Sequence, residues 1–238
     1  MTMVRLTDRP RVDDFRALSR SSPWRFNTLH FRHRSTDFGD EVEAWLDRPS
    51  QRVTVRSSEG VEVSHGVPYG TSGNARDFLD RDEPEFRPDG LVIERPRMWH
   101  LAHGDPMWRN YIWTAMLDPE ELSHGVHIHD VRTESRLGRR TWSATCRPLM
   151  GVGEDWEGGY DPRCGCCPLL DSEASRLLEY GPDRTGSSND ALPTSYRVHL
   201  DVQTAITVEI AALDGNPSTI LRNEILDVDT PLTPPQAN

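Results

Sequence analysis

The chain contains no lysine, and this absence excludes several enzyme classes. All 27 basic residues among its 238 residues are arginine. P-loop nucleotide hydrolases and protein kinases place a lysine on the phosphates of their nucleotide. Pyridoxal-phosphate enzymes and Schiff-base aldolases form a covalent bond through a lysine amine. None of these mechanisms is open to this chain.

Long apolar runs and the common catalytic motifs are also missing. No run approaches the ~18–20 apolar residues of a membrane-spanning helix, and the charged N-terminus has no signal-peptide core. We therefore expect a cytoplasmic protein without a membrane span. No Gly-x-Ser-x-Gly elbow, His-Glu-x-x-His helix or glycine-rich phosphate loop occurs. These absences favour binding over catalysis.

Basic residues are also fewer than acidic ones. The 38 acidic residues outnumber the 27 basic ones and give a formal net charge of -11. Such a surface repels phosphate backbones, which argues against nucleic acid as a partner. The one arginine-rich stretch, residues 132–147, has the pattern of a solvated hairpin.

What the sequence does contain is period-two alternation, which predicts two sets of antiparallel strands. The closing segment, residues 195–228, reads as three strands joined by turns at Gln203-Thr204 and Asp214-Gly215. The other predicted strands cover residues 24–34, 40–46, 52–57, 61–65, 126–137 and 140–147. We expect one domain over residues 23–232, preceded by a flexible arm at 1–22 and followed by a tail at 233–238. Residues 68–89 have no periodicity and predict a long loop.

A helix is predicted between the two strand sets. Asp105 is placed to cap it, Pro106 suits its first position, and apolar residues recur at helical spacing through Met116. Asp118-Pro119 repeats the same start signal for a second turn ending near Leu122. One face of this segment is aromatic and must pack against a large surface, which the sheet offers. A further short helix is expected within residues 169–180.

Three segments carry a resemblance to a known family: GRRTWSATCRP (138–148), YRVHLDVQTAITVEI (196–210) and LRNEILDVDTPL (221–232). With the tryptophan-rich helix between two strand sets, they resemble the bacterial lipoprotein-localisation factor family. That family includes periplasmic lipoprotein carriers, lipid-binding mycobacterial lipoproteins and sensor domains of sigma-factor regulators. The resemblance implies an α+β fold, predominantly antiparallel β, in which a curved half-barrel sheet is covered on its concave side by short helices. Ala205 stands where the family has glycine, and the Cys-Gly-Cys-Cys segment is not part of its pattern.

The same resemblance implies a hydrophobic ligand, an acyl chain or lipid, or else a partner protein segment beneath the helix. The candidate ligand-binding residues are Trp108, Tyr111, Ile112, Trp113 and Met116. Apolar pockets between a helix and a curved sheet are common ligand sites, but an aromatic stripe at helical spacing also fills protein cores. The sequence leaves both interpretations open.

Cys164, Cys166 and Cys167 form the densest group of reactive side chains. Three thiolates so close together are able to ligate zinc or copper, with Cys146 or a histidine as fourth ligand. The C-x-C-C spacing differs from the C-x₂-C of a zinc knuckle, so a redox pair or a packed structural turn stay open as alternatives.

His127 and His129 have the same parity on a predicted strand, about 7 Å apart, so they form a second possible metal pair or simply a solvated face. No cofactor is expected from the sequence, with zinc as the exception that the cysteines allow.

Overall fold

The structure is a computed structural model that describes residues 5–36, 38–66, 83–96, 99, 103–153, 156–181, 192–215 and 219–236. One limb of its main sheet contains β1 (Thr28–Ser35), β2 (Val42–Asp47), β3 (Arg52–Ser57) and β4 (Gly60–His65). The other contains β7 (Val126–Arg136), β8 (Arg139–Pro148), β9 (Tyr196–Asp201), β10 (Thr207–Ala212) and β11 (Thr219–Val228). The alternation in the sequence thus places these strands correctly to within a few residues.

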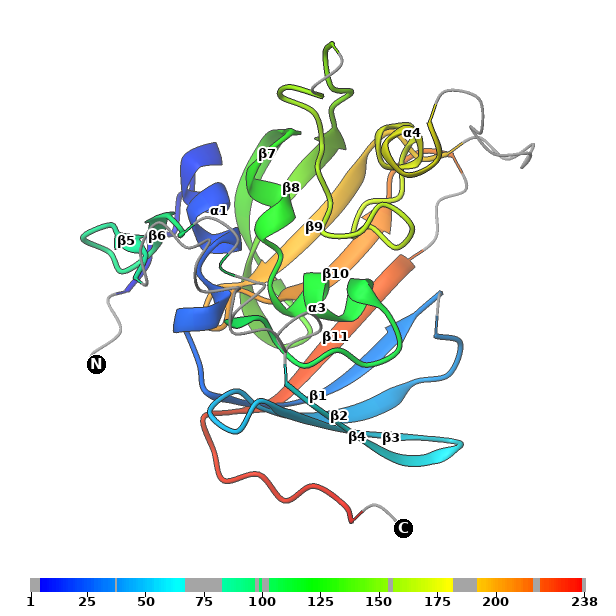
Figure 1. The fold of residues 1–238 in the computed structure, drawn as a ribbon. Helices are drawn as coiled ribbons and strands as arrows, with labels where there is room; N and C mark the ends of the chain where they lie inside the picture. Colours follow the sequence, from blue (N-terminus) through cyan, green and yellow to red (C-terminus); the bar gives the residue numbers. More distant parts are fainter. Residues whose placement is uncertain are drawn as a thin grey trace.

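These nine strands form one antiparallel sheet in the order β4-β3-β2-β1-β11-β10-β9-β8-β7. The described residues contain no pairing between the edge strands β4 and β7, so the sheet is open. Its two limbs bend around a short helical segment (Figure 1). The predicted fold class, a curved half-barrel sheet with short helices on its concave side, is confirmed.

The curvature has a local cause in the strands. Register shifts interrupt β1 against β11 at His30/Phe31, β10 against β9 at Thr207/Glu209, and β7 against β8 at His129/Arg132. An extra residue on one strand bends it and increases its twist. The β7–β8 hairpin closes through Leu137 and Gly138, which both have positive φ as its tight turn requires.

The helices lie on the concave side of the sheet and at its rim (Figure 1). They are α1 (Val12–Ser19), η1 (Ser22–Trp24), α3 (Tyr111–Leu117), η3 (Glu120–Ser123) and α4 (Glu173–Tyr180). A separate two-stranded hairpin pairs β5 (Glu85–Phe86) with β6 (Val92–Glu94). Among the residues described, none of the helices has the length and apolar character needed to cross a membrane.

The N-terminal segment differs from the flexible arm expected over residues 1–22. Phe15 and Leu18 of α1 are fully buried in the common core, and Leu6 before them is buried too. The Arg16 guanidinium donates hydrogen bonds to the carbonyl oxygens of Ser123 (2.5 Å) and Val126 (2.7 Å). Residues 5–22 therefore belong to the packed domain. The polar composition of this segment did not indicate the helix, because only a few residues of α1 form its buried face.

The central helix starts later than its sequence signals predict. α3 begins at Tyr111, and its N-cap is Asn110, whose side chain accepts a hydrogen bond from the Ile112 N–H. The side chains of Asp105 and Asp118 do not act as the predicted N-caps; they bind arginines, as described below, and Asp118 is instead the C-cap residue of α3. Residues 68–82 of the predicted 68–89 loop lie outside the described residues.

Candidate functional site

The concave face of the sheet holds a cluster of aromatic rings beneath α3. Trp113 lies 5.5 Å from Phe31 and 5.4 Å from His33 of β1, measured between ring centroids. Trp108 lies 5.2 Å from Trp113 and 5.2 Å from Phe38, which follows β1. The alternation of β1 explains the arrangement, because Phe31 and His33 share the face that α3 covers.

The five candidate ligand-binding residues do not all share one environment. Trp108, Ile112, Trp113 and Met116 are buried in the core, whereas Tyr111 is only half-buried at the first turn of α3. The rings pack against one another. Three cavities of about 270, 430 and 500 Å³ lie among described residues, and none of these three is lined by the five candidates.

A polar chain of side chains runs through this aromatic cluster. His33 Nδ1 lies 2.7 Å from Asn223 Oδ1, and Asn223 Nδ2 donates to the Thr207 carbonyl oxygen at 2.7 Å. Because the Asn223 amide is oriented by Thr207, its oxygen accepts from His33, which places the imidazole proton on Nδ1. Burial lowers the pKa of His33 to about 4, so the ring is neutral. Its Nε2 is then a bare acceptor.

Four polar atoms of this cluster are buried without a hydrogen-bond partner: His33 Nε2, Trp108 Nε1, Trp113 Nε1 and Thr207 Oγ1. Other buried polar atoms without partners, Trp142 Nε1 among them, lie elsewhere in the described chain. Buried polar groups in native proteins are nearly always hydrogen-bonded, and one left unpaired costs about 1–3 kcal/mol. The cluster therefore combines an apolar wall with unused donors and one unused acceptor.

The sequence reasoning missed His33, Asn223 and Thr207. A signal was present, since His33 shares the inward parity of Leu29 and Phe31 on β1. In the pairing of β1 with β11, Asn223 lies directly opposite His33. Polar residues at inward positions of both strands mark a buried polar site.

The segment of residues 105–118, which we call the lid, is held at both ends by buried ion pairs. At its start Asp105 accepts two hydrogen bonds from Arg48, at 2.8 and 2.7 Å. At its end Asp118 accepts from Arg95 at 2.9 and 2.5 Å, and from Arg163 at 2.9 Å. The cavity of about 270 Å³ is lined by Arg48, Asp105 and Asp118, among other residues.

The charge at the end of the lid is stabilised by its arginines. Burial alone would raise the pKa of Asp118, but the guanidinium groups of Arg95 and Arg163 outweigh it and hold that pKa far below its ordinary value. Between the two anchors, Arg109 has a positive φ and pairs with Glu59 in the β3–β4 turn at 2.9 Å. The lid is thus held by charge at three points: at the β2–β3 turn through Asp105, at the β3–β4 turn through Arg109, and at the residue after β6 and the cysteine loop through Asp118.

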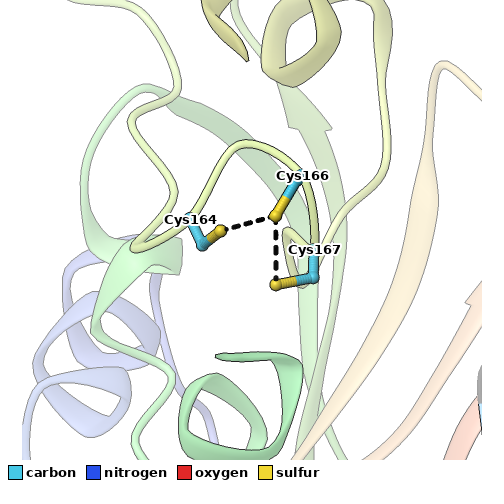
Figure 2. A group of neighbouring side chains, drawn as sticks. All are labelled: Cys164, Cys166 and Cys167. Carbon is cyan, nitrogen blue, oxygen red and sulfur yellow. Dashed lines mark hydrogen bonds between the residues drawn. The ribbon is translucent and has the colours of Figure 1, made fainter. Parts of the chain in front are cut away.

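The cysteine loop lies beside the lid. The Sγ atoms of Cys164 and Cys166 are 2.9 Å apart, those of Cys166 and Cys167 are 3.8 Å apart, and all three lie within 4.8 Å of one another (Figure 2). Burial raises the pKa of Cys167 to about 12. Burial acts in the same direction on Cys164, but hydrogen bonds from the other two thiols and from the backbone N–H groups of Cys166 and Cys167 lower its pKa overall.

The other candidate metal ligands are not part of this sulfur group. Cys146 is fully buried on β8 opposite Tyr196, and burial raises its pKa to about 12. His127 and His129 lie side by side on β7, with ring centroids 5.3 Å apart, and both are exposed. Among the described residues only the three loop cysteines form a group with metal-ligand spacing.

Comparison with known proteins gives distant structural similarity. No family model matches the chain, and no curated protein matches it in sequence. The MucA/MucB complex of Pseudomonas aeruginosa matches 94% of this chain at 14% identity and a TM-score of 0.39. A crystal structure of MucB matches 92% at 11% identity and a TM-score of 0.36.

LprF from Mycobacterium bovis matches 97% of this chain, over its whole length, at 10% identity and a TM-score of 0.39. The chain spans 58% of the length of the MucB chains.

Proposed function

We propose that this chain is a non-catalytic binding protein that holds a hydrophobic ligand, an acyl chain or lipid, or an extended partner segment on the concave face of its half-barrel beneath the lid. One observation carries the proposal. Three buried polar atoms without partners, His33 Nε2, Trp108 Nε1 and Trp113 Nε1, belong to the aromatic cluster between the sheet and a short helix, and Thr207 Oγ1 is a fourth on the strand whose carbonyl orients Asn223. A core that served stability alone would be better filled with apolar residues, since each unpaired group is costly.

The unpaired atoms indicate which head group fits. Two indole N–H groups and the Thr207 hydroxyl are able to donate, and His33 Nε2 accepts. A protonated carboxylic acid, an alcohol or an amide carries both a donor and an acceptor, so it is able to pair with either kind of atom. The adjoining rings of Phe31 and Phe38 offer apolar surface to a hydrocarbon chain. An acyl chain with a carboxyl or amide head therefore fits the cluster best.

Entry of such a ligand requires the lid to move, because the rings of Trp108 and Trp113 fill the concave face. The ion pairs at Asp105 and Asp118 hold the ends of the lid, so we expect the residues between them to lift as one unit. The Arg109–Glu59 pair is the weakest of the three ties, since both its side chains are exposed. It is the tie that we expect to open first.

The test has two parts. Native mass spectrometry of protein purified from its own host is expected to show an added lipid-sized mass that organic extraction removes. The extracted protein is then titrated with the fluorescent fatty acid cis-parinaric acid. We expect saturable binding, weakened about fivefold in Trp113→Phe, since that change removes one donor worth about 1 kcal/mol and keeps an aromatic ring.

Trp45→Phe is the matched control. Trp45 lies on the opposite face of the sheet, where it stacks on His30 at 4.8 Å, so its replacement is expected to leave binding unchanged. Absence of both the added mass and saturable fatty-acid binding would contradict the proposal. The aromatic residues of the lid would then serve only as part of the hydrophobic core.

A further inference from the structure

We propose that Cys164, Cys166 and Cys167 form a binding site for one monovalent copper ion, independent of the concave-face site. Packing does not account for the three residues. Cys166 is exposed, so it contributes no buried surface, whereas Cys146 on β8 shows what a structural cysteine in this fold looks like, fully buried among apolar neighbours.

The distances between the sulfurs are close to those of a shared metal ion. Metal–sulfur bonds of about 2.3 Å place neighbouring sulfurs about 3.8–4 Å apart. The Cys166–Cys167 separation of 3.8 Å already has this value, and the 2.9 Å between Cys164 and Cys166 opens to it with a movement of about 1 Å. A small change of side-chain torsion supplies that movement without altering the backbone.

The loop is held in place before any ion binds. Arg163 and Leu169, which bracket the cysteines, both donate their backbone N–H to the buried carboxylate of Glu121, at 3.2 and 2.8 Å. The Tyr160 hydroxyl donates to the same carboxylate. These three hydrogen bonds join the two ends of the cysteine loop at the side chain of Glu121. The Glu121 carboxylate is buried, and this burial raises its pKa.

Two further contacts hold Cys167 and the loop backbone at Gly165. The backbone N–H of Tyr111, at the start of α3, donates to the Cys167 sulfur. On the other side α4 packs so closely on Gly165 that a Cβ there would lie 2.7 Å from Glu179 Oε2 and 2.8 Å from its Cβ. The loop backbone and the Cys167 sulfur, held in this way, lose little freedom when a metal binds, which favours affinity.

Ligand type and number select copper(I). Thiolate ligands prefer copper(I), zinc and iron–sulfur clusters to harder cations. No fourth histidine, cysteine or carboxylate of the described residues joins the group. Three sulfurs complete a trigonal shell for copper(I), whereas a closed zinc site needs four protein ligands. Because Cys166 is exposed, the ion reaches the site directly from solvent, and the bound thiols release their protons.

The experiment is a copper(I) titration of the full-length, reduced protein without oxygen, in competition with bathocuproine disulfonate. We expect one copper per chain to be withheld from the chelator by the wild type and by Cys146→Ala. Cys166→Ser is expected to lose this retention with its fold intact, as judged by circular dichroism, because the side chain is exposed. In a parallel titration with zinc, a chelator is expected to remove the metal readily.

Three results would overturn the proposal. One is equal copper retention by a variant with all three loop cysteines changed to serine. Another is one tightly held zinc per chain with no copper retention, which would reassign the metal. The third is a Cys164–Cys166 disulfide that persists in excess glutathione and prevents copper binding, which would make the pair a redox element. None of these measurements involves the concave face.

Discussion

Replacement of Asp118 by asparagine is the sharpest test of how the lid is held. The Asp118 carboxylate is almost completely buried and accepts hydrogen bonds from Arg95 and Arg163. Asparagine keeps the size of the side chain but removes its charge. Arg163 then loses its ion-pair partner, and Arg95 keeps Glu120, at 2.8 Å, as its ion-pair partner together with its hydrogen bonds to the Arg20 carbonyl oxygen.

The expected cost follows from burial. Removal of one partner from a buried pair leaves an uncompensated charge and costs about 3–5 kcal/mol. The pH dependence of stability provides a second, independent test of the Asp118 ion pair. The pKa of Asp118 in the folded state is below its unfolded value of about 3.9, so its contribution is present above about pH 4 and is lost as the pH falls further. The difference in free energy of unfolding between wild type and Asp118→Asn should therefore become smaller as the pH falls below about 4.

Urea denaturation followed by circular dichroism, at pH 7 and at several values below pH 4, measures both effects. The control is Asp8→Asn, because Asp8 pairs with Arg5 and Arg140 at the surface and such pairs contribute at most about 1 kcal/mol. The reasoning would be refuted if Asp118→Asn lost less than about 1 kcal/mol of unfolding free energy at pH 7. It would also be refuted if the difference in unfolding free energy between wild type and Asp118→Asn stayed constant down to pH 2.

Two more predictions concern the concave face and the rim. Because the pKa of His33 is lowered from 6.5 to about 4, the unfolded chain binds the extra proton between these values, and stability should fall by about 1.4 kcal/mol per pH unit on acidification. His33→Gln should remove that part of the slope in urea denaturation, and His65→Gln, at an exposed position, should not. Gly125→Ala should cost about 2–4 kcal/mol by thermal denaturation, since φ is +58° and the new Cβ would lie 1.9 Å from the Gly159 carbonyl oxygen. Gly138→Ala, at φ +74° with open space around it, should cost only about 1 kcal/mol; equal losses would show that the close approach to Gly159 is not what requires glycine.

The sheet could be predicted from sequence because its signals are local. Alternation, turn residues and hairpin spacing are each contained within a dozen residues, and every strand of both limbs lies where they place it. The docking of α1 could not be predicted in the same way. Its buried face consists of only a few residues, and the Arg16 contacts that hold it reach residues more than 100 positions away.

The turn after Asp201 places an alanine in a backbone conformation that favours glycine, and the structure accommodates it. Ala205 adopts a φ of +63°, where glycine would be unstrained. The Asp201 carboxylate accepts hydrogen bonds from the backbone of Gln203 and Thr204 and from the Thr204 hydroxyl, while Arg139 binds it from outside. A left-handed residue costs about 1–2 kcal/mol, which this number of hydrogen bonds is able to offset.

The two aspartates of the lid show why the candidate site was only partly predictable. By local rules, an aspartate before proline caps a helix, which is worth about 1 kcal/mol. Asp105 and Asp118 have that sequence context, yet both bind arginines that are 57 and 23 residues away in the sequence. A buried charge without a partner costs several kcal/mol, so pairing outweighs capping wherever an arginine lies within reach. With no lysine in the chain, every such partner is a guanidinium, which binds a carboxylate through two parallel hydrogen bonds. The buried arginine pairs at Asp105 and Asp118 therefore hold so short a lid at both ends.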